Sequence, residues 1–179
     1  MKKTSFSVII ARSAVLVALA LVFLFLTQAA PTMDLALIAA ASICIALVVA
    51  EFGPAAGFLS YAAASVLSFL MFPGATLLFI LFFGWYPILK CLLERIDRKT
   101  VEWIIKLLIL NALYLVIWFL FNFLFTAMYD SLGEIVASSV FIFVMSAILV
   151  NTAFILYDVG LSRVLSYYIR VIMPKIRKK

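Results

Sequence analysis

Histidine is absent from the 179-residue sequence, and charged residues are scarce, at 12%. The lack of histidine excludes imidazole general bases, histidine-bound metals and Ser-His catalysis. The lack of charge excludes a soluble globular domain, in which about a quarter of the residues are charged. The only two cysteines, Cys44 and Cys91, lie in apolar segments, so neither a zinc cage nor a disulfide framework is expected.

Signatures of catalysis are missing as well. The sequence has no glycine-rich phosphate loop, no HExxH or GxSxG motif, and no acidic cluster suited to holding Mg²⁺ within a bilayer. No polar pair has the spacing of a nucleophile and its base. We therefore expect a protein that is not an enzyme and that needs no cofactor and no metal.

Long apolar runs dominate the chain, and 68% of its residues are hydrophobic. A helix that spans a membrane needs about 20 mostly apolar residues. Six segments are of this kind, and helix-breaking or capping residues separate them. They cover residues 7–26, 35–50, 55–72, 75–93, 101–127 and 135–157. The sequence thus predicts an all-α, polytopic membrane protein, a compact bundle of six transmembrane helices.

The distribution of charge favours one orientation in the membrane. With six spans, all 14 lysines and arginines fall on the same side, whereas the opposite loops carry only the acids Asp34, Asp130 and Glu134. By the positive-inside rule, both termini are expected in the cytoplasm. The first span begins like a signal peptide, but its apolar stretch is long for one, so we expect it to be retained.

Five charged residues lie near the cytoplasmic ends of the spans. Arg12 and Lys106 lie about one turn inside their helices and are expected to snorkel outward. Glu102 precedes Lys106 by four residues and can pair with it on one helical face. Glu51 and Asp158 are expected at solvated edges, where a charge costs little, and proton coupling through them is not favoured.

The residues after the sixth span differ in character. Apolar side chains from position 161 to 172 can line one helical face, Arg163 and Arg170 fall on another, and residues 175–179 form a basic cluster. This pattern predicts an interfacial helix with a basic end that contacts the lipid bilayer. We therefore divide the chain into a transmembrane domain, residues 1–159, and a cytoplasmic tail, residues 160–179. Two roles of this tail remain open: an anchor that fixes the topology in the membrane, and a binding site for a partner. Nucleic acid is not an expected partner.

The fifth span carries a polar and aromatic stripe. Its residues are spaced by 3, 4 and 4 positions and share one face: Asn111, Tyr114, Trp118 and Asn122. Such a face is expected to point into the bundle, because unpaired polar groups are costly in lipid. Two interpretations remain open: interhelical hydrogen bonds worth roughly 0.6 to 2 kcal/mol each, or a pocket for a small-molecule substrate.

Other polar residues are expected near the outer surface of the membrane, at the same depth as the end of this stripe. Ser138 and Ser139 lie at the outer end of the last span, while Gln28 and Asp34 flank the first outer loop. Together they can form the rim of an outward-facing cavity. The expected substrate contacts are Gln28, Asp34, Trp118, Asn122, Ser138 and Ser139.

Small residues recur at helical spacing in two spans. The third span has one at every fourth position, namely Ala56, Ser60, Ala64 and Ser68. Small side chains let helices approach closely, so internal packing is expected there. For the shorter pair Ala14 and Ala18 in the first span, internal packing and docking to another membrane subunit both remain open. In the fourth span, Pro87 predicts a kink.

This pattern resembles the substrate-binding S component of an energy-coupling-factor (ECF) transporter. The resemblance rests on six short-looped spans, cytoplasmic ends and the run ARSAVLVALA at residues 11–20. In that family a small-xxx-small face on the first helix docks against a transmembrane coupling subunit, and Ala14 and Ala18 match it. The resemblance implies capture of a vitamin-like or other micronutrient by the outer parts of the last three helices and the first loop. Partner ATPases then supply the energy for uptake.

A second resemblance implies a different role. The six-helix plan is similar to that of the cell-shape protein MreD, and residues 51–95 resemble uncharacterised six-helix bacterial membrane proteins. The alternative function is a non-transporting scaffold that recruits partners through its basic inner face and tail. Either resemblance implies a multi-pass protein of the bacterial plasma membrane. The outer loops lack basic residues, which favours neutral, aromatic or cationic ligands over strongly anionic ones.

Overall fold

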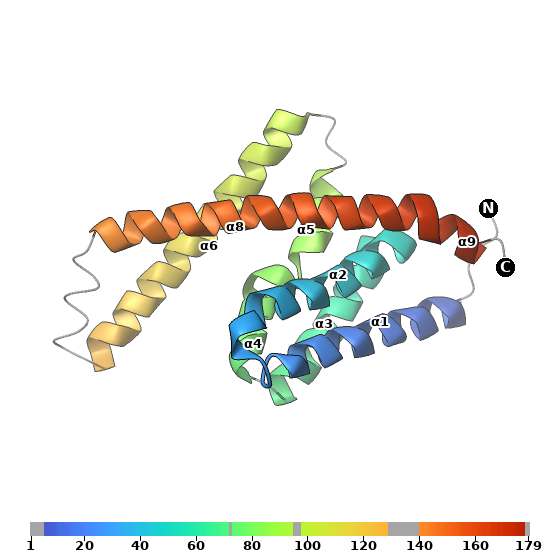
Figure 1. The fold of residues 1–179 in the computed structure, drawn as a ribbon, viewed down its shortest axis with the longest axis horizontal. Helices are drawn as coiled ribbons and strands as arrows, with labels where there is room; N and C mark the ends of the chain where they lie inside the picture. The colour runs from blue at the N-terminus through green and yellow to red at the C-terminus, as the bar shows by residue number, and fades with distance from the viewer. Residues whose placement is uncertain (1–5, 72, 95–97, 129–139, 178–179) are drawn as a thin grey trace. The chain divides into compact units, whose positions relative to one another are not determined.

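The structure, a computed structural model, describes residues 6–71, 73–94, 98–128 and 140–177. These residues are almost entirely helical and contain no strand (Figure 1). Within them, six helical stretches are long and apolar enough to cross a membrane. These are Phe6–Leu26, Asp34–Phe52, Pro54–Met71, Thr76–Leu93, Lys99–Leu120 and Phe141–Lys175. The prediction of an all-α protein with six membrane-spanning helices is confirmed.

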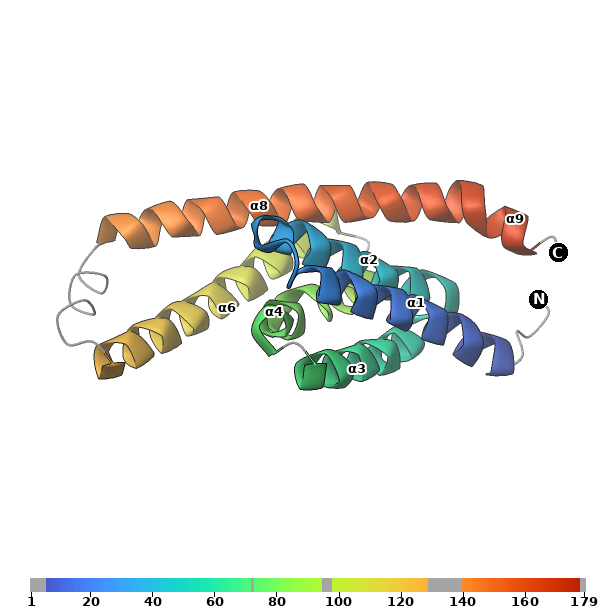
Figure 2. The ribbon, with the colours of Figure 1, turned by 60° about the horizontal axis from the view of Figure 1, so that its bottom comes forward.

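Contacts between residues divide the chain into two compact units. The first unit comprises Met1–Arg95 together with Leu161–Lys179, and the second comprises Ile96–Gly160. Among the described residues before 95, the α-helices of the first unit are α1 (Phe6–Leu26), α2 (Asp34–Phe52), α3 (Pro54–Met71), α4 (Pro73–Leu78) and α5 (Tyr86–Leu93). Of these, α1, α2 and α3 pack against one another, as Figure 2 shows, and α5 packs against α2 and α3.

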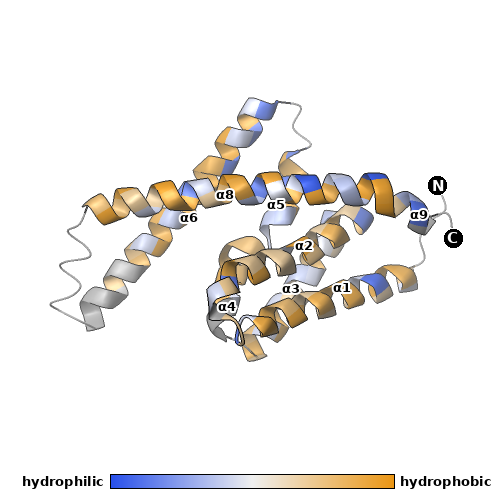
Figure 3. Ribbon diagram, viewed as in Figure 1, coloured by the Kyte–Doolittle hydropathy of each residue, from blue (hydrophilic) through white to orange (hydrophobic). Residues whose placement is uncertain are grey.

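The core of the first unit is apolar and rich in small side chains. It is formed by Val17, Ala20, Leu24, Ile38, Ala41, Cys44, Ile45, Ala64 and Phe79. Ala20, Ala41 and Ala64 are fully buried, and their size lets the three helix backbones approach closely. Large apolar side chains are exposed along α1 and α3, as expected for helices that face lipid. In Figure 3, which colours the ribbon by hydropathy, α1 is mostly orange.

A single residue links α2 to α3. Gly53 has a φ of 91°, a left-handed conformation that side-chain-bearing residues rarely adopt. Its N–H donates to the carbonyl of Val49 at 2.9 Å, which closes the last turn of α2. Pro54 then begins α3, where a missing N–H costs nothing because the first turn of a helix has no partner for it. The chain therefore reverses direction with almost no loop.

The fourth span is interrupted where Pro87 predicts a kink. After α4 comes a π-helical turn, Phe79–Phe83, and α5 begins only at Tyr86, with the proline in its first turn. Neighbouring helices supply hydrogen bonds to carbonyls of the π turn: Ser42 of α2 donates to Phe83 at 2.5 Å, and Tyr61 of α3 donates to Ile80 at 2.9 Å. Irregular backbone at membrane depth is tolerated because protein side chains satisfy it.

The described part of the second unit contains α6 (Lys99–Met128) and α8 (Val140–Tyr167) up to Gly160. The start of the predicted sixth span, residues 135–139, lies outside the described residues. Beyond Gly160, α8 continues into the first unit, where a π-helical turn, Tyr168–Ile172, and α9 (Met173–Arg177) follow. The helix thus has no break at the predicted domain boundary after residue 159, and the division itself stays a prediction.

Candidate functional site

The predicted substrate contacts are distributed over both units. In the first unit, Gln28 follows α1 and is exposed, while Asp34 opens α2 with a buried carboxylate oxygen, Oδ1, that has no hydrogen-bond partner. In the second unit, Trp118 lies half-buried on α6, and Asn122 lies one turn further along the same helix. The side chain of Asn122 is outside the described residues, as are Ser138 and Ser139. The predicted cavity rim therefore stays a prediction.

The polar stripe of α6 forms hydrogen bonds to α8. The side-chain amides of Asn111 and Asn151 donate to each other's carbonyl oxygens at 3.1 Å in both directions. One turn further, the Tyr114 hydroxyl donates to the carbonyl of Phe143 at 3.0 Å and lies 2.7 Å from the hydroxyl of Ser146. For Asn111 and Tyr114, the interpretation as interhelical hydrogen bonds is confirmed.

Trp118 extends this contact with an aromatic group. Its ring lies edge-on to Phe143, with 5.3 Å between centroids, and 6.1 Å from the ring of Tyr114. On the other side of α6, Trp118 borders an open apolar hollow that is lined by Leu115, Val116, Phe119 and Leu120. All the lining residues come from one helix, so this hollow is a surface feature of α6. Its aromatic members are Trp118 and Phe119, which are open to a ligand or to lipid.

The two small-residue patterns have different surroundings. In α3, Ser60, Ala64 and Ser68 are buried, which confirms internal packing for this helix. In α1, both Ala14 and Ala18 are exposed, whereas Val17 and Ala20 on a neighbouring face are buried in the core. The core of the first unit thus does not use the small face of α1. Docking through Ala14 and Ala18 stays a prediction.

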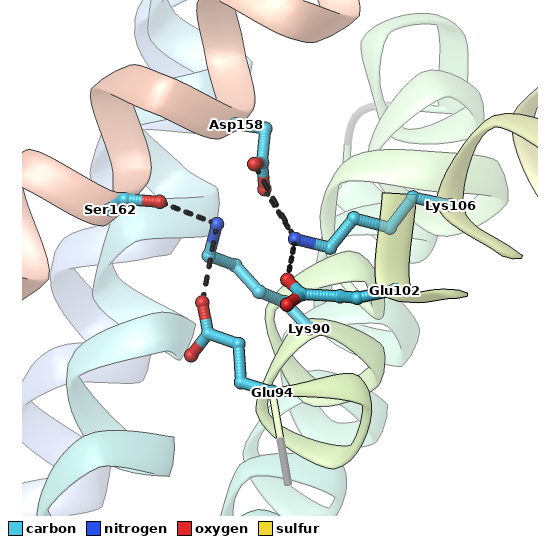
Figure 4. Close-up of polar contacts among 6 residues, drawn as sticks. All are labelled: Lys90, Glu94, Glu102, Lys106, Asp158 and Ser162. Carbon is cyan, nitrogen blue, oxygen red and sulfur yellow. Dashed lines mark hydrogen bonds and ion pairs between the residues drawn. The ribbon is translucent and has the colours of Figure 1, made fainter. Parts of the chain in front are cut away.

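Lys106 lies at the centre of a buried ionic cluster in the second unit. Its Nζ is 2.5 Å from Oε1 of Glu102 and 3.3 Å from Oδ1 of Asp158 (Figure 4). The same ammonium group lies over the ring of Trp103, 5.5 Å from its centroid. The predicted pairing of Glu102 with Lys106 is confirmed. The predicted snorkelling of Lys106 is wrong, because its side chain is only 2% exposed. The expectation of a solvated edge for Asp158, which is 4% exposed, is wrong too.

Glu51 and Lys90 are buried charges of the first unit, and the C-terminal segment, residues 161–177, contacts both. Glu51 is 8% exposed, accepts a hydrogen bond from the Tyr168 hydroxyl, and lies 3.6 Å from the guanidinium of Arg12. The expectation of a solvated edge for Glu51 is therefore wrong. Arg12 does stay partly exposed, but it reaches toward Glu51.

The Lys90 ammonium donates to the hydroxyl of Ser162 at 2.7 Å and lies 3.5 Å from Oε1 of Glu94 (Figure 4). Its side chain is only 2% exposed. Sequence reasoning missed this residue because a lysine at the inner end of a span already satisfies the positive-inside rule. The spacing of Lys90 and Glu94, one turn apart, was the only local signal. Removal of these partners would leave a buried charge without compensation, which is costly.

The described residues contain no group of three acidic or cysteine side chains close enough to hold a metal ion. Comparisons with protein families, with curated proteins and with solved structures find no match for this chain. Function therefore has to be inferred from the geometry alone. The features available for it are the exposed small face of α1, the aromatic surface at Trp118, and the basic C-terminal segment.

Proposed function

We propose that this protein is the membrane-embedded substrate-binding subunit of an uptake system, with an energy-supplying complex as its partner. The observation that carries the proposal is the exposed small face of α1, made by Ala14 and Ala18. A helix that faces only lipid gains nothing from small side chains, because lipid chains fill the space beside any residue. A helix that meets another helix gains close backbone contact.

The buried face of α1 supports this assignment. Val17, Ala20 and Leu24 hold the helix firmly in the core of the first unit. A docking helix has to transmit force to the rest of its subunit, and this requires rigid internal packing behind the docking face. The substrate in this proposal is a small vitamin-like molecule that stacks on Trp118, with Gln28, Asp34, Asn122, Ser138 and Ser139 as further contacts.

Docking is tested by introducing bulk on α1. The Ala14→Leu and Ala18→Leu variants should recover at least tenfold less of a co-expressed coupling subunit and its ATPases on affinity purification, because leucine keeps the helices apart. The matched control is Ala63→Leu, which adds the same bulk at an exposed alanine of α3. Undiminished recovery with both α1 variants would remove the docking role from this helix.

Substrate binding is tested separately. Mass spectrometry of the purified chain should detect a co-purified small molecule, and adding that molecule back should quench tryptophan fluorescence. The Trp118→Phe variant should lose this quenching, whereas Trp85→Phe should keep it, because Trp85 already donates its indole N–H to Leu81. Equal quenching in the two variants would place the ligand elsewhere.

A membrane scaffold is the second candidate function. It is favoured by the exposed cations of the C-terminal segment, among them Arg163, Arg170 and Lys175. A scaffold should contain no co-purified small molecule, and truncation after residue 160 should abolish recovery of its protein partners. A substrate-binding subunit should keep its coupling subunit in the Arg163→Gln/Arg170→Gln variant, which preserves the helix.

A further inference from the structure

The net charge of the protein resides in its last 19 residues. The whole chain carries 14 basic and eight acidic residues, for a net charge of +6. Six of the basic residues and none of the acidic ones lie in residues 161–179, so residues 1–160 carry eight of each and are neutral. Topology alone does not require this concentration, because the inner loops before residue 160 already supply basic residues.

The C-terminal segment has an inner face that is anchored to the first unit. Leu161 is buried, Ser162 accepts the hydrogen bond of the buried Lys90, and Tyr168 donates to the buried Glu51. The two polar contacts lie six residues apart along the segment and involve α5 and α2. They fix the rotation of the segment about its own axis, so that its other face has a defined composition.

The outer face of the segment combines cationic, aromatic and aliphatic side chains. Arg163, Tyr167 and Arg170 are all exposed and are spaced by four and three residues, which places them along one helical face. Tyr167 is 62% exposed, and Val164 and Ile169 are exposed beside this face. The described part of the segment has no carboxylate of its own to neutralise either arginine.

We propose that the face formed by Arg163, Tyr167 and Arg170 binds the headgroup of an anionic phospholipid. Guanidinium groups pair with phosphate oxygens through bidentate hydrogen bonds. Tyrosine is enriched at the level of the headgroups, where its ring contacts acyl chains and its hydroxyl stays hydrated. The exposed valine and isoleucine complete a surface that is apolar toward the bilayer and positive toward the phosphate.

A lipid suits this face better than a soluble partner. The cations alternate with exposed apolar side chains, which a dissolved acidic peptide would leave in water. The segment also includes the last two turns of α8, a helix that is long and apolar enough to cross a membrane. Since the inner face is fixed by its contacts to Lys90 and Glu51, the cations are presented in one arrangement, which lowers the entropy lost on binding.

The test measures lipid binding to the full-length protein in neutral detergent micelles. Phosphatidylglycerol and phosphatidylcholine are titrated separately, and bound lipid is counted by native mass spectrometry. The Arg163→Gln/Arg170→Gln variant should bind phosphatidylglycerol about 25-fold more weakly, since each basic residue near an anionic surface contributes roughly 1 kcal/mol. The control, Arg98→Gln/Lys99→Gln, removes two exposed cations at the start of α6 and should bind like the wild type.

Three outcomes would overturn the proposal. Equal losses in the two double variants would show a general charge effect, and equal binding of the two lipids would show that the headgroup charge is not recognised. Displacement by excess inorganic phosphate would identify a site for the free anion. The Tyr167→Trp variant retains both arginines and gives a local readout. Its tryptophan fluorescence should be quenched more by brominated phosphatidylglycerol than by brominated phosphatidylcholine. Equal quenching by the two lipids would contradict the proposal.

Discussion

The three N-terminal helices of the first unit and the two long helices of the second unit differ in the contacts that dominate their packing. In the first unit, α1, α2 and α3 meet through buried apolar residues, many of them as small as Ala20, Ala41 and Ala64. In the second unit, α6 and α8 are joined by polar side chains at successive levels. These levels are Lys106 with Asp158, Asn111 with Asn151, and Tyr114 with Ser146.

The difference shows what apolar contact can achieve in a bilayer. Leucine against leucine is no better than leucine against lipid, so apolar helices associate only where small residues permit close backbone contact. The first unit meets this condition. In the second unit, α6 has large residues such as Leu108 and Val116 on its surface, and specific hydrogen bonds and ion pairs supply the attraction instead.

The largest expected effect comes from removing the central cation of the second unit. In the Lys106→Met variant, Asp158 and Glu102 lose the cation between them, and we expect the free energy of unfolding to fall by about 3 to 5 kcal/mol. Unfolding in mixed micelles with a denaturing detergent measures this loss. The Lys99→Met variant, at an exposed position one turn before Glu102, should lose little.

A second substitution separates pairing from simple loss of charge. The Lys106→Met/Asp158→Asn double variant should recover a large part of the stability, because the more deeply buried carboxylate is then neutral. If Lys106→Met proved as stable as Lys99→Met, the second unit would not depend on its polar pairs, and the contrast between the units would fail.

A pair of glycines probes close packing in the two units. A methyl group at Gly84, in the first unit, would lie 2.6 Å from the ring of Tyr61, whereas one at Gly160, in the second, would meet nothing within 4 Å. We expect Gly84→Ala to destabilise by about 1 to 3 kcal/mol through overpacking. Gly160→Ala should stabilise by roughly 0.5 to 1 kcal/mol, because alanine favours a helix interior. Thermal unfolding in detergent measures both, and equal shifts would refute the contrast.

The smallest expected effect concerns the paired amides. Asn111→Leu leaves the Asn151 amide without its partner, and we expect a loss of roughly 0.6 to 2 kcal/mol. The Asn111→Leu/Asn151→Leu double variant removes both amides and should be more stable than either single variant. A double-mutant cycle measured by unfolding gives the coupling energy, and a coupling of zero would make the hydrogen bonds irrelevant to helix association.

Much of the fold follows from sequence patterns. The spans and the interruption before Pro87 depend on local composition and backbone chemistry, so they can be located from neighbouring residues alone. The pairing of Glu102 with Lys106 depends on helical spacing and was predicted for the same reason. The stripe of α6 indicated a buried face, but hydrogen bonds and a ligand pocket require the same residue types, so the pattern did not distinguish them.

The buried charges could not be predicted in this way. Lys90 forms a hydrogen bond with Ser162, which is 72 residues away in the sequence, and Glu51 forms one with Tyr168, which is 117 residues away. No spacing rule relates residues so far apart, because their contact depends on which helices become neighbours. The positive-inside rule gives the side of the membrane on which a charge lies, and it does not tell whether that charge is hydrated or paired. Lys106 and Asp158 were misjudged for this reason.

The single-residue link at Gly53 has a mechanical consequence. Its N–H and its carbonyl are both engaged, the first by Val49 of α2 and the second by Gly57 of α3, so the elbow between the two helices has no slack. A movement of α2 is therefore expected to carry α3 with it, because no flexible loop separates the two helices. An insertion of flexible residues at this elbow would let α2 and α3 move independently of each other.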